Sequence, residues 1–432
     1  TLPDGDFSVG GSLTVDAGNL RDSDNILSLI APRANLFLSA VSEGTQLNTQ
    51  LDALTLDIQG SNDFTVVDSD DLLIDGWAWQ GVLNLESLAG NVIIGDLGGS
   101  TVDGDLSITV PDASSVIVEQ SGISLNGNLD IHAGDMHNLA DASVSFTARD
   151  ARLDLAAQAA STVFTTNVER LDFRSRGSNI TIFDQVDLTL LNVDVDQDFS
   201  LSSEADLIIL DSVPSIGGTA SFTAANGSQL TIPDAQFTHA NASFNAGSLS
   251  DGNGNLAFSG GRLSLRLTDQ AGNLGLDLAL DNLSVDIAGA NALAINSTQA
   301  LTLVQWESHE VADLSITSTG DLTIPDSGLD FADQLVISVP DISSTSRQIA
   351  LSGNYLDLGV TAPAGQIQLN VALEALEANL GAGANLVVND VDGLSLVDNN
   401  SDPGAIFIAD GNFSLTLSTG DLIVNGDIRA RD

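Results

Sequence analysis

The sequence contains no cysteine and no lysine, and aromatic residues occupy only 4% of its 432 positions. Without cysteine, disulfide bridges and thiolate metal sites are excluded. Without lysine, its 12 basic residues are all arginines, and they face 59 acidic residues. No apolar run approaches the roughly 18 residues that a membrane-spanning helix requires. We therefore expect no membrane insertion.

The charge and composition narrow the class of protein further. A formal net charge of −47 argues against nucleic acids and anionic membranes as partners. A hydrophobic content of 43% is enough for a large core, and because aromatic residues are few, we expect it to be built from Leu, Ile, Val and Ala. Asp, Asn, Gly, Ser and Thr dominate the polar residues, and they favour turns and strand edges over helices.

Triplets of the form apolar-x-apolar recur in four copies of one pattern. From the opening residue of each copy to its second triplet, the distance is 37, 38, 37 and 37 residues. Successive triplets within a copy lie about 19 residues apart, a spacing typical of short solenoid repeats. They begin at Leu36, Leu54 and Leu72; at Leu153, Leu171 and Leu188; at Leu263, Leu283 and Leu301; and at Leu356, Leu376 and Leu394. Self-similarity at fixed spacing indicates a repeat architecture.

A period of about 19 residues suits one coil of a parallel β-helix. Each triplet puts two side chains on one face of a short strand, and glycine or proline supplies the corners. We predict an all-β chain, a right-handed parallel β-helix (solenoid) over residues 1–432 with coils of about 19 residues. Its larger repeats are 1–96, 97–213, 214–325 and 326–432. At about 4.8 Å per coil, the rod would be roughly 100 Å long.

Tandem immunoglobulin-like sandwiches are the competing architecture, because modules near 100 residues suit them. The second triplets of successive copies lie 117, 112 and 93 residues apart. A solenoid can lose one coil and close up, because each coil contacts only its neighbours. A sandwich shortened by the same length would lose two strands from its core. The shortened spacing therefore favours the β-helix. Residues Val371 to Leu380 have helical spacing, but Leu376 holds a triplet position, so we predict a strand there.

The loops after the third triplets differ most between copies, and two of the three tryptophans share one position in them. Trp77 and Trp306 follow the third-triplet leucine by five residues, where the other copies have Val193 and Asn399. Trp79 follows Trp77 by two residues. Two interpretations remain open. The indoles are exposed ligand-binding groups that stack on a sugar ring or a partner chain, or they close the hydrophobic interior at a wide corner.

Aspartate-rich strings supply the candidate metal ligands. Asp194, Asp196 and Asp198 alternate along one expected strand face, and hard oxygen ligands suit Ca²⁺. Similar strings run from Val67 to Asp71 and from Asp398 to Asp402. None matches the EF-hand loop or the calcium-binding nonapeptide repeat. The alternative is that these residues are solvated turn aspartates. No other cofactor is implied.

Five of the twelve arginines lie between Arg149 and Arg176. In stacked coils they would interleave with aspartates as an outer electrostatic ladder, worth little per pair. A site for an acidic sugar is the alternative. The four histidines show no metal-ligand spacing, and no G-x-S-x-G elbow or phosphate-binding loop occurs. We therefore predict that the protein is not an enzyme.

Strands of the form G-x-L-x-I/V, such as Gly104 to Ile108, combine here with coils of about 19 residues and turns rich in Gly, Asn, Ala and Ser. In this texture the whole chain resembles the filamentous-haemagglutinin-like exoproteins, large repetitive bacterial adhesins often exported by two-partner secretion. The resemblance implies an extracellular right-handed β-helix that acts as a stalk or adhesive filament, without an enzymatic role.

The expected function is that of a structural or adhesive rod, secreted or on a bacterial cell surface, that mediates cell–cell, cell–matrix or biofilm contact. Its partners would be extracellular polysaccharide, another cell surface, or further copies of itself. One alternative is a self-assembling surface-layer or extracellular filament subunit, whose end coils should pair with another copy. The second is a polysaccharide-processing enzyme on the same fold, which should have a long groove.

Overall fold

The computed structural model describes residues 6–20, 26–41, 44–60, 62–95, 102–119, 122–140, 143–209, 214–251, 254–309, 311–398, 406–409 and 411–431. The chain divides into two compact units, Thr1–Thr219 (unit 1) and Ala220–Asp432 (unit 2). The described residues contain strands and no helix, and parallel stacked coils form a β-solenoid of about 20 turns. The predicted all-β parallel solenoid is confirmed, and an antiparallel sandwich is excluded.

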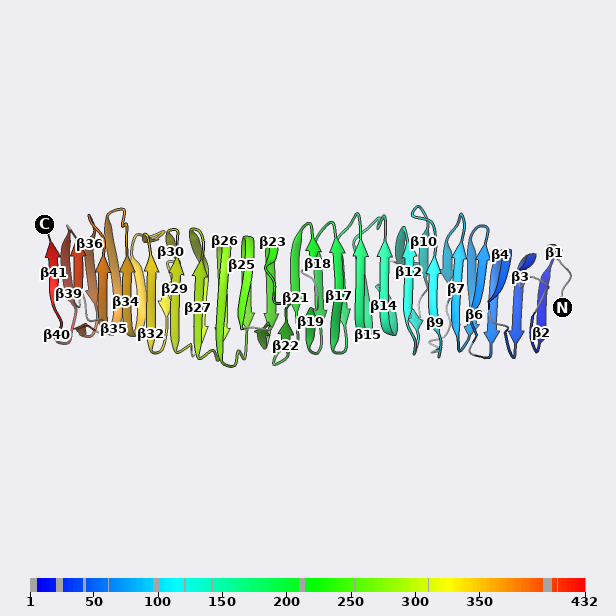
Figure 1. Cartoon of the computed structure of the whole chain (residues 1–432), viewed down its shortest axis with the longest axis horizontal. Coiled ribbons are helices and arrows are strands. Elements are labelled where there is room, and N and C mark those ends of the chain that lie inside the picture. Colours follow the sequence, from blue (N-terminus) through cyan, green and yellow to red (C-terminus); the bar gives the residue numbers. More distant parts are fainter. Residues whose placement is uncertain are drawn as a thin grey trace. The chain divides into compact units, whose positions relative to one another are not determined.

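Four consecutive strands recur as a set, two long ones followed by two shorter ones. Within each unit, Figure 1 shows such strands lying side by side. In unit 1 the sets are β3 (Ile26–Leu38), β4 (Thr45–Ile58), β5 (Phe64–Asp68) and β6 (Leu72–Ala78); and β14 (Val144–Leu155), β15 (Thr162–Ser175), β16 (Ile180–Asp184) and β17 (Leu188–Val195). In unit 2 they are β25 (Asn255–Leu267), β26 (Asn273–Ala288), β27 (Ala292–Ser297) and β28 (Leu301–His309); and β34 (Ile349–Val360), β35 (Gln366–Leu380), β36 (Asn385–Asp390) and β37 (Leu394–Val397), the last continued by β38 (Ile406–Ala409).

Shorter strands complete the coils between these sets. From Asp6 to Thr223 they are β1 (Asp6–Ser8), β2 (Ser12–Ala17), β7 (Val82–Ser87), β8 (Val92–Ile94), β9 (Asp105–Thr109), β10 (Ser115–Val118), β11 (Ile123–Ser124), β12 (Leu129–Ala133), β13 (Asp135–Asn138), β18 (Phe199–Ser203), β19 (Leu207–Ile209), β20 (Ser215–Ile216) and β21 (Thr219–Thr223). In the second half they are β22 (Gln229–Thr231), β23 (Phe237–Ala246), β24 (Ser248–Ser250), β29 (Asp313–Ser318), β30 (Leu322–Ile324), β31 (Leu329–Asp330), β32 (Gln334–Val339), β33 (Ile342–Ser344), β39 (Asn412–Leu417), β40 (Leu422–Asn425) and β41 (Ile428–Arg431).

The segment with helical spacing, Val371 to Leu380, lies within β35 and is a strand, as predicted from its place in the repeat. Leu376 pairs with Leu356 of the coil below and with Leu396 of the coil above. Alternating residues of β35 therefore enter the core, although the local sequence favours a helix. The stacking neighbours decide the conformation.

The triplets mark the right strands but do not always stack as their spacing suggests. Leu36 pairs with Leu56, whereas Leu54 pairs with Ala34, so the register differs by two residues from an alignment of Leu36 on Leu54. In the third copy, Leu263 pairs with Leu283 as the triplets imply. A shift of two residues keeps the same face inward, so the burial pattern survives the error.

Alternation along the strands produces a closed apolar core, seen in the burial of every second residue of β5. Phenylalanine contributes more than the composition suggests. In unit 1, the ring centroids of Phe146 and Phe164 are 6.2 Å apart, and those of Phe164 and Phe173 are 5.7 Å apart. Phe146 lies on β14, one coil below Phe164, whereas Phe164 and Phe173 lie on the same strand, β15. The core is therefore aliphatic with an aromatic stack, rather than aliphatic alone.

In each set, the second of the two long strands turns at one acidic residue. This residue has no partner in the register that pairs the two long strands. These four corner carboxylates are Asp52, Glu169, Asp281 and Glu374. All four are exposed. In the third copy the residue before the corner of the coil below is Gly260, with φ +140°, and a Cβ there would lie 1.6 Å from the carbonyl oxygen of His239. That close approach of backbones requires glycine.

Candidate functional site

The fourth strand of the set carries the same irregularity in three copies. Relative to the strand below, β6, β17 and β28 each contain one extra residue, and these residues are Asp75, Leu191 and Val304. A β-bulge of this kind bends the strand and re-aims the side chains that follow it. Because it recurs at one place in the repeat, the bulge defines where copies can differ without disturbing the core.

The tryptophans follow these bulges within the strands. Trp77 pairs with Leu56, Val193 with Phe173, and Trp306 with Val285. Trp77 is 7% exposed and Trp306 is 5% exposed. Rings that stack on a sugar need an open face, so this burial corrects the expectation of exposed indoles. The geometry favours the other interpretation, in which the indoles close the interior at a wide corner.

Trp79 is also buried, with 4% exposure, and it stands edge-on to Trp77 at a centroid distance of 5.1 Å. Its Nε1–H donates a hydrogen bond of 2.8 Å to the carbonyl oxygen of Asp105, the first residue of β9. A surface depression of about 340 Å³ lies beside it, lined also by Asp57, Gln59, Gln80 and Asp103. Its lining combines these polar side chains with Ile58, Ala78 and Val102.

The fourth copy replaces the single-residue bulge with a longer insertion. Leu376 pairs with Leu396 in β37, but Ala378 pairs with Ile406 in β38. Ile406 is therefore the residue that corresponds to Trp77 and Trp306, and it is buried. Asn399, which the spacing placed there, lies outside the described residues. Because of this insertion, counting five residues from Leu394 does not reach the residue that corresponds to Trp77 and Trp306.

The expected calcium ligands do not share a strand face. The strand β17 ends at Val195, so Asp196 and Asp198 lie beyond it. Arg176 lies 2.5 Å from Asp194 and 3.2 Å from Asp196. Asp198 instead accepts a hydrogen bond of 2.7 Å from the backbone N–H of Thr219. Arg176 thus bridges Asp194 and Asp196, whereas a backbone N–H engages Asp198.

These contacts belong to the arginine ladder that the sequence indicated. Arg170 lies 2.5 Å from Asp150, and Arg174 lies 3.4 Å from Asp154. Hydrogen bonding to Arg170 holds the pKa of Asp150 below its ordinary value. The Arg176 guanidinium does the same to the pKa of Asp194, again chiefly through its hydrogen bond. The interleaved arrangement is confirmed. Because the groups are exposed, each pair contributes little to stability.

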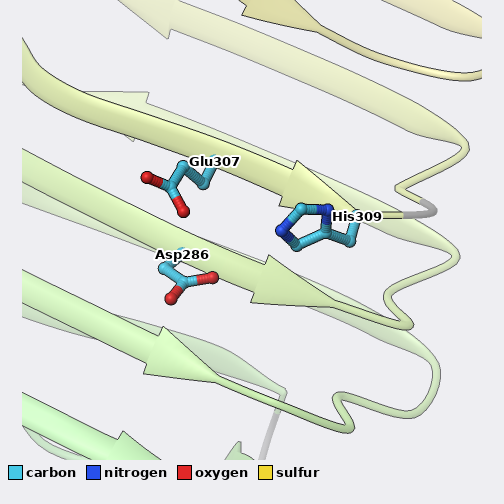
Figure 2. A group of neighbouring side chains, drawn as sticks. All are labelled: Asp286, Glu307 and His309. Carbon is cyan, nitrogen blue, oxygen red and sulfur yellow. The ribbon is translucent and has the colours of Figure 1, made fainter.

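Three potential metal ligands meet on the third copy instead. One ligand atom from each of Asp286, Glu307 and His309 lies within 4.8 Å of the others, and among the described residues this is the group of three that meets that criterion. Figure 2 shows the two carboxylates and the imidazole gathered over β26 and β28. Asp286 is half-buried, and the other two side chains are exposed.

Sequence reasoning missed this group, although a signal was present. Asp194 and Asp196 follow Leu190 by four and six residues, and Glu307 and His309 follow Leu303 by the same numbers. The second and third copies thus carry potential ligands at equivalent positions. The third ligand, Asp286, comes from the preceding coil through its pairing with Glu307. Only that pairing brings it near.

Two aspartates are buried rather than solvated: Asp68, which belongs to an aspartate-rich string, and Asp184, which lies outside those strings. Asp68 accepts hydrogen bonds from the hydroxyl of Thr49 and, at 3.1 Å, from the backbone N–H of Leu51. It is fully buried, and this desolvation raises its pKa to about 6. Asp184, hydrogen-bonded to the Thr166 hydroxyl, has a raised pKa for the same reason. This corrects the solvated interpretation for the string that contains Asp68.

The histidines occupy four different environments. His132 contacts Asp112 at 3.5 Å through Nε2 and Asp154 at 3.6 Å through Nδ1. His239 is buried, with its ring 4.6 Å from that of Phe237, and His309 joins Asp286 and Glu307. His137 lies 2.9 Å from Asp135.

In the part of the chain that the structure describes, no helix is long and apolar enough to cross a membrane.

No protein-family model matches the sequence, and neither a curated protein nor a solved structure is significantly similar to it. The resemblance to filamentous-haemagglutinin-like exoproteins therefore depends on repeat texture.

Proposed function

We propose that this β-solenoid is a structural, adhesive scaffold of a bacterial cell surface or secreted matrix, which mediates cell–cell, cell–matrix or biofilm contact. The observation that supports this best is the recurrence of the corner carboxylates Asp52, Glu169, Asp281 and Glu374, one exposed acid at an equivalent corner of every copy. Repeated identical groups give multivalent contact, in which weak individual interactions add to a strong one.

The chemistry suits a hydroxyl-rich, neutral polysaccharide as the partner. Carboxylates accept hydrogen bonds from hydroxyl groups, and each corner offers such an acceptor to solvent. A net charge of −47 would repel an acidic polymer or an anionic surface. The long paired strands behind the corners hold them in a fixed register, which limits the entropy lost on binding.

The test compares two variants of equal charge. The corner variant carries Asp52→Asn, Glu169→Gln, Asp281→Asn and Glu374→Gln, and the control carries Asp63→Asn, Asp130→Asn, Asp269→Asn and Asp421→Asn, which are exposed elsewhere. We expect the wild type and the control to sediment with insoluble neutral polysaccharide, and the corner variant to remain largely in solution. Equal sedimentation of all three proteins, or none, would contradict the proposal.

The same samples distinguish the two alternatives. A polysaccharide-processing enzyme would release new reducing ends or unsaturated products from the polymer. A self-assembling subunit would increase in mass with protein concentration in analytical ultracentrifugation without any polysaccharide. We expect neither signal from an adhesive scaffold of this kind.

A further inference from the structure

The second copy shows how this fold satisfies ligand-like side chains after the bulge. There, Asp194 and Asp196 flank the guanidinium of Arg176, at 2.5 Å and 3.2 Å. Arg174, on the strand below, lies 3.6 Å from Asp194 as well. The Arg176 guanidinium thus bridges the two carboxylates, and Arg174 contacts one of them. In this copy an arginine therefore supplies the cation at the position after the bulge.

The third copy keeps the ligands and loses those cations. By register, Glu307 corresponds to Asp194 and His309 to Asp196, whereas Asp286 stands in place of Arg174 and Ala288 in place of Arg176. Among the residues that the structure describes, no basic side chain forms an ion pair with Glu307. The cationic bridge of the second copy therefore has no counterpart between Glu307 and His309.

Neighbouring side chains orient the two carboxylates. Arg266 Nε lies 3.2 Å from Oδ2 of Asp286, and Gln305 Nε2 donates a hydrogen bond of 3.1 Å to Oε1 of Glu307. A carboxylate has two oxygens, so each keeps a second one for another partner. Outer contacts of this kind hold metal ligands in place in known sites. Pairing between β26 and β28 fixes the spacing of Asp286 and Glu307.

From this arrangement we infer that Asp286, Glu307 and His309 bind one divalent transition-metal ion, with Zn²⁺ as the representative. An imidazole with two carboxylates is a donor set that Zn²⁺ accepts, whereas Ca²⁺ takes oxygen ligands. Three protein ligands leave the remaining positions to water, which suits the exposure of Glu307 and His309. The site differs from the calcium ligands that the sequence suggested in both its residues and its metal.

The experiment is isothermal titration calorimetry of the full chain with Zn²⁺, repeated with Ca²⁺. We expect saturable binding of one Zn²⁺ per chain that excess Ca²⁺ does not displace. His309→Ala should weaken this binding by at least about tenfold, because it removes a ligand. Ala288→Arg should weaken it similarly while leaving all three ligands in place, because the new guanidinium reproduces the cation of the second copy.

His132→Ala is the matched control. It also removes an exposed histidine flanked by two aspartates, but those aspartates contact opposite nitrogens of the ring. Its affinity for Zn²⁺ should equal that of the wild type, and circular dichroism should show unchanged strand content in all variants. Absence of saturable Zn²⁺ binding would overturn the inference. So would binding that both His309→Ala and Ala288→Arg leave unchanged, or non-saturating heats that are alike for Zn²⁺ and Ca²⁺.

Discussion

At the scale of single residues, Asp68 shows how the solenoid tolerates an ionisable group in its interior. Its hydrogen-bond donors come from the Thr49 hydroxyl and from the backbone N–H groups of Leu51 and Asp70. They stabilise the carboxylate, but the cost of removing it from water is larger, so the pKa rises. The third copy has Ser297 at the corresponding position, which avoids the charge.

The raised pKa of Asp68 predicts a specific pH dependence of stability. Folded Asp68 keeps its proton up to about pH 6, whereas the unfolded carboxyl loses it near its ordinary pKa of 3.8. Between these values the folded state binds more protons. Asp68 therefore contributes stability that is complete below about pH 4 and is lost as the pH rises through about 6. A shift of this size corresponds to about 3 kcal/mol.

Asp68→Asn removes this titration, so the decline in unfolding free energy between pH 4 and pH 6 should be smaller in the variant. Urea denaturation across this pH range measures it. Asp52→Asn, at an exposed carboxyl of the same unit, is the control and should keep the wild-type slope. An Asp68→Asn slope identical to that of the wild type would show that burial does not govern this carboxyl.

At the scale of elements, the bulge decides which side chains of a strand face outward. In β28 the extra residue Val304 is exposed, and after it Trp306 points into the core while Glu307 and His309 lie outside. Because side chains alternate with a period of two, removing one residue exchanges the two faces of everything that follows. The bulge therefore couples the buried indole to the outward ligands.

Deletion of Val304 should consequently expose Trp306, turn Glu307 inward and destabilise unit 2. The measurement is Trp306 fluorescence in a background with Trp77→Phe and Trp79→Phe, where the emission should shift to longer wavelength. The substitution Val304→Ala keeps the bulge and changes an exposed side chain, so its emission and stability should match those of the parent. An unshifted emission in the deletion variant would mean that the strand re-registers without exchanging its faces.

At the scale of the whole molecule, charge of one sign dominates. The 59 acidic residues outnumber the 12 arginines almost fivefold. Five of those arginines form the ion pairs of one ladder on unit 1. The excess carboxylates repel one another in the folded state, and this repulsion destabilises the folded state. Exposed ion pairs such as those of the ladder contribute little to stability, so screening them with salt removes little stabilisation.

Added salt should therefore stabilise the protein. Between about 0.01 M and about 1 M NaCl the Debye length falls from about 30 Å to about 3 Å, which screens the repulsion between exposed carboxylates. The melting temperature should rise, by about 2–4 °C for each kcal/mol of repulsion relieved in a unit of this size. Differential scanning calorimetry at each NaCl concentration measures the melting temperature. Denaturation by an uncharged denaturant serves as the reference. A melting temperature that falls with salt would make the ion pairs, rather than repulsion, the dominant electrostatic effect.

The amino-acid sequence by itself determined the class of fold and the strand identity of ambiguous segments. A periodicity of about 19 residues and the absence of helix-favouring surfaces predicted a parallel solenoid. The repeat position of Leu376 identified β35 as a strand. The interleaved arginines and aspartates followed from the same coil spacing. These features depend on distances along the chain, which a sequence contains completely.

Only the tertiary structure decided which residues meet between coils. Triplet spacing misjudged the register of Leu36 by two residues, and one-residue bulges placed Trp77 and Trp306 inside rather than on exposed turns. The burial of Asp68 and the approach of Asp286 to His309 depend on the same inter-coil pairing. The physical reason is that a bulge changes the face of every following side chain while leaving the hydrophobic pattern of the sequence nearly unaltered.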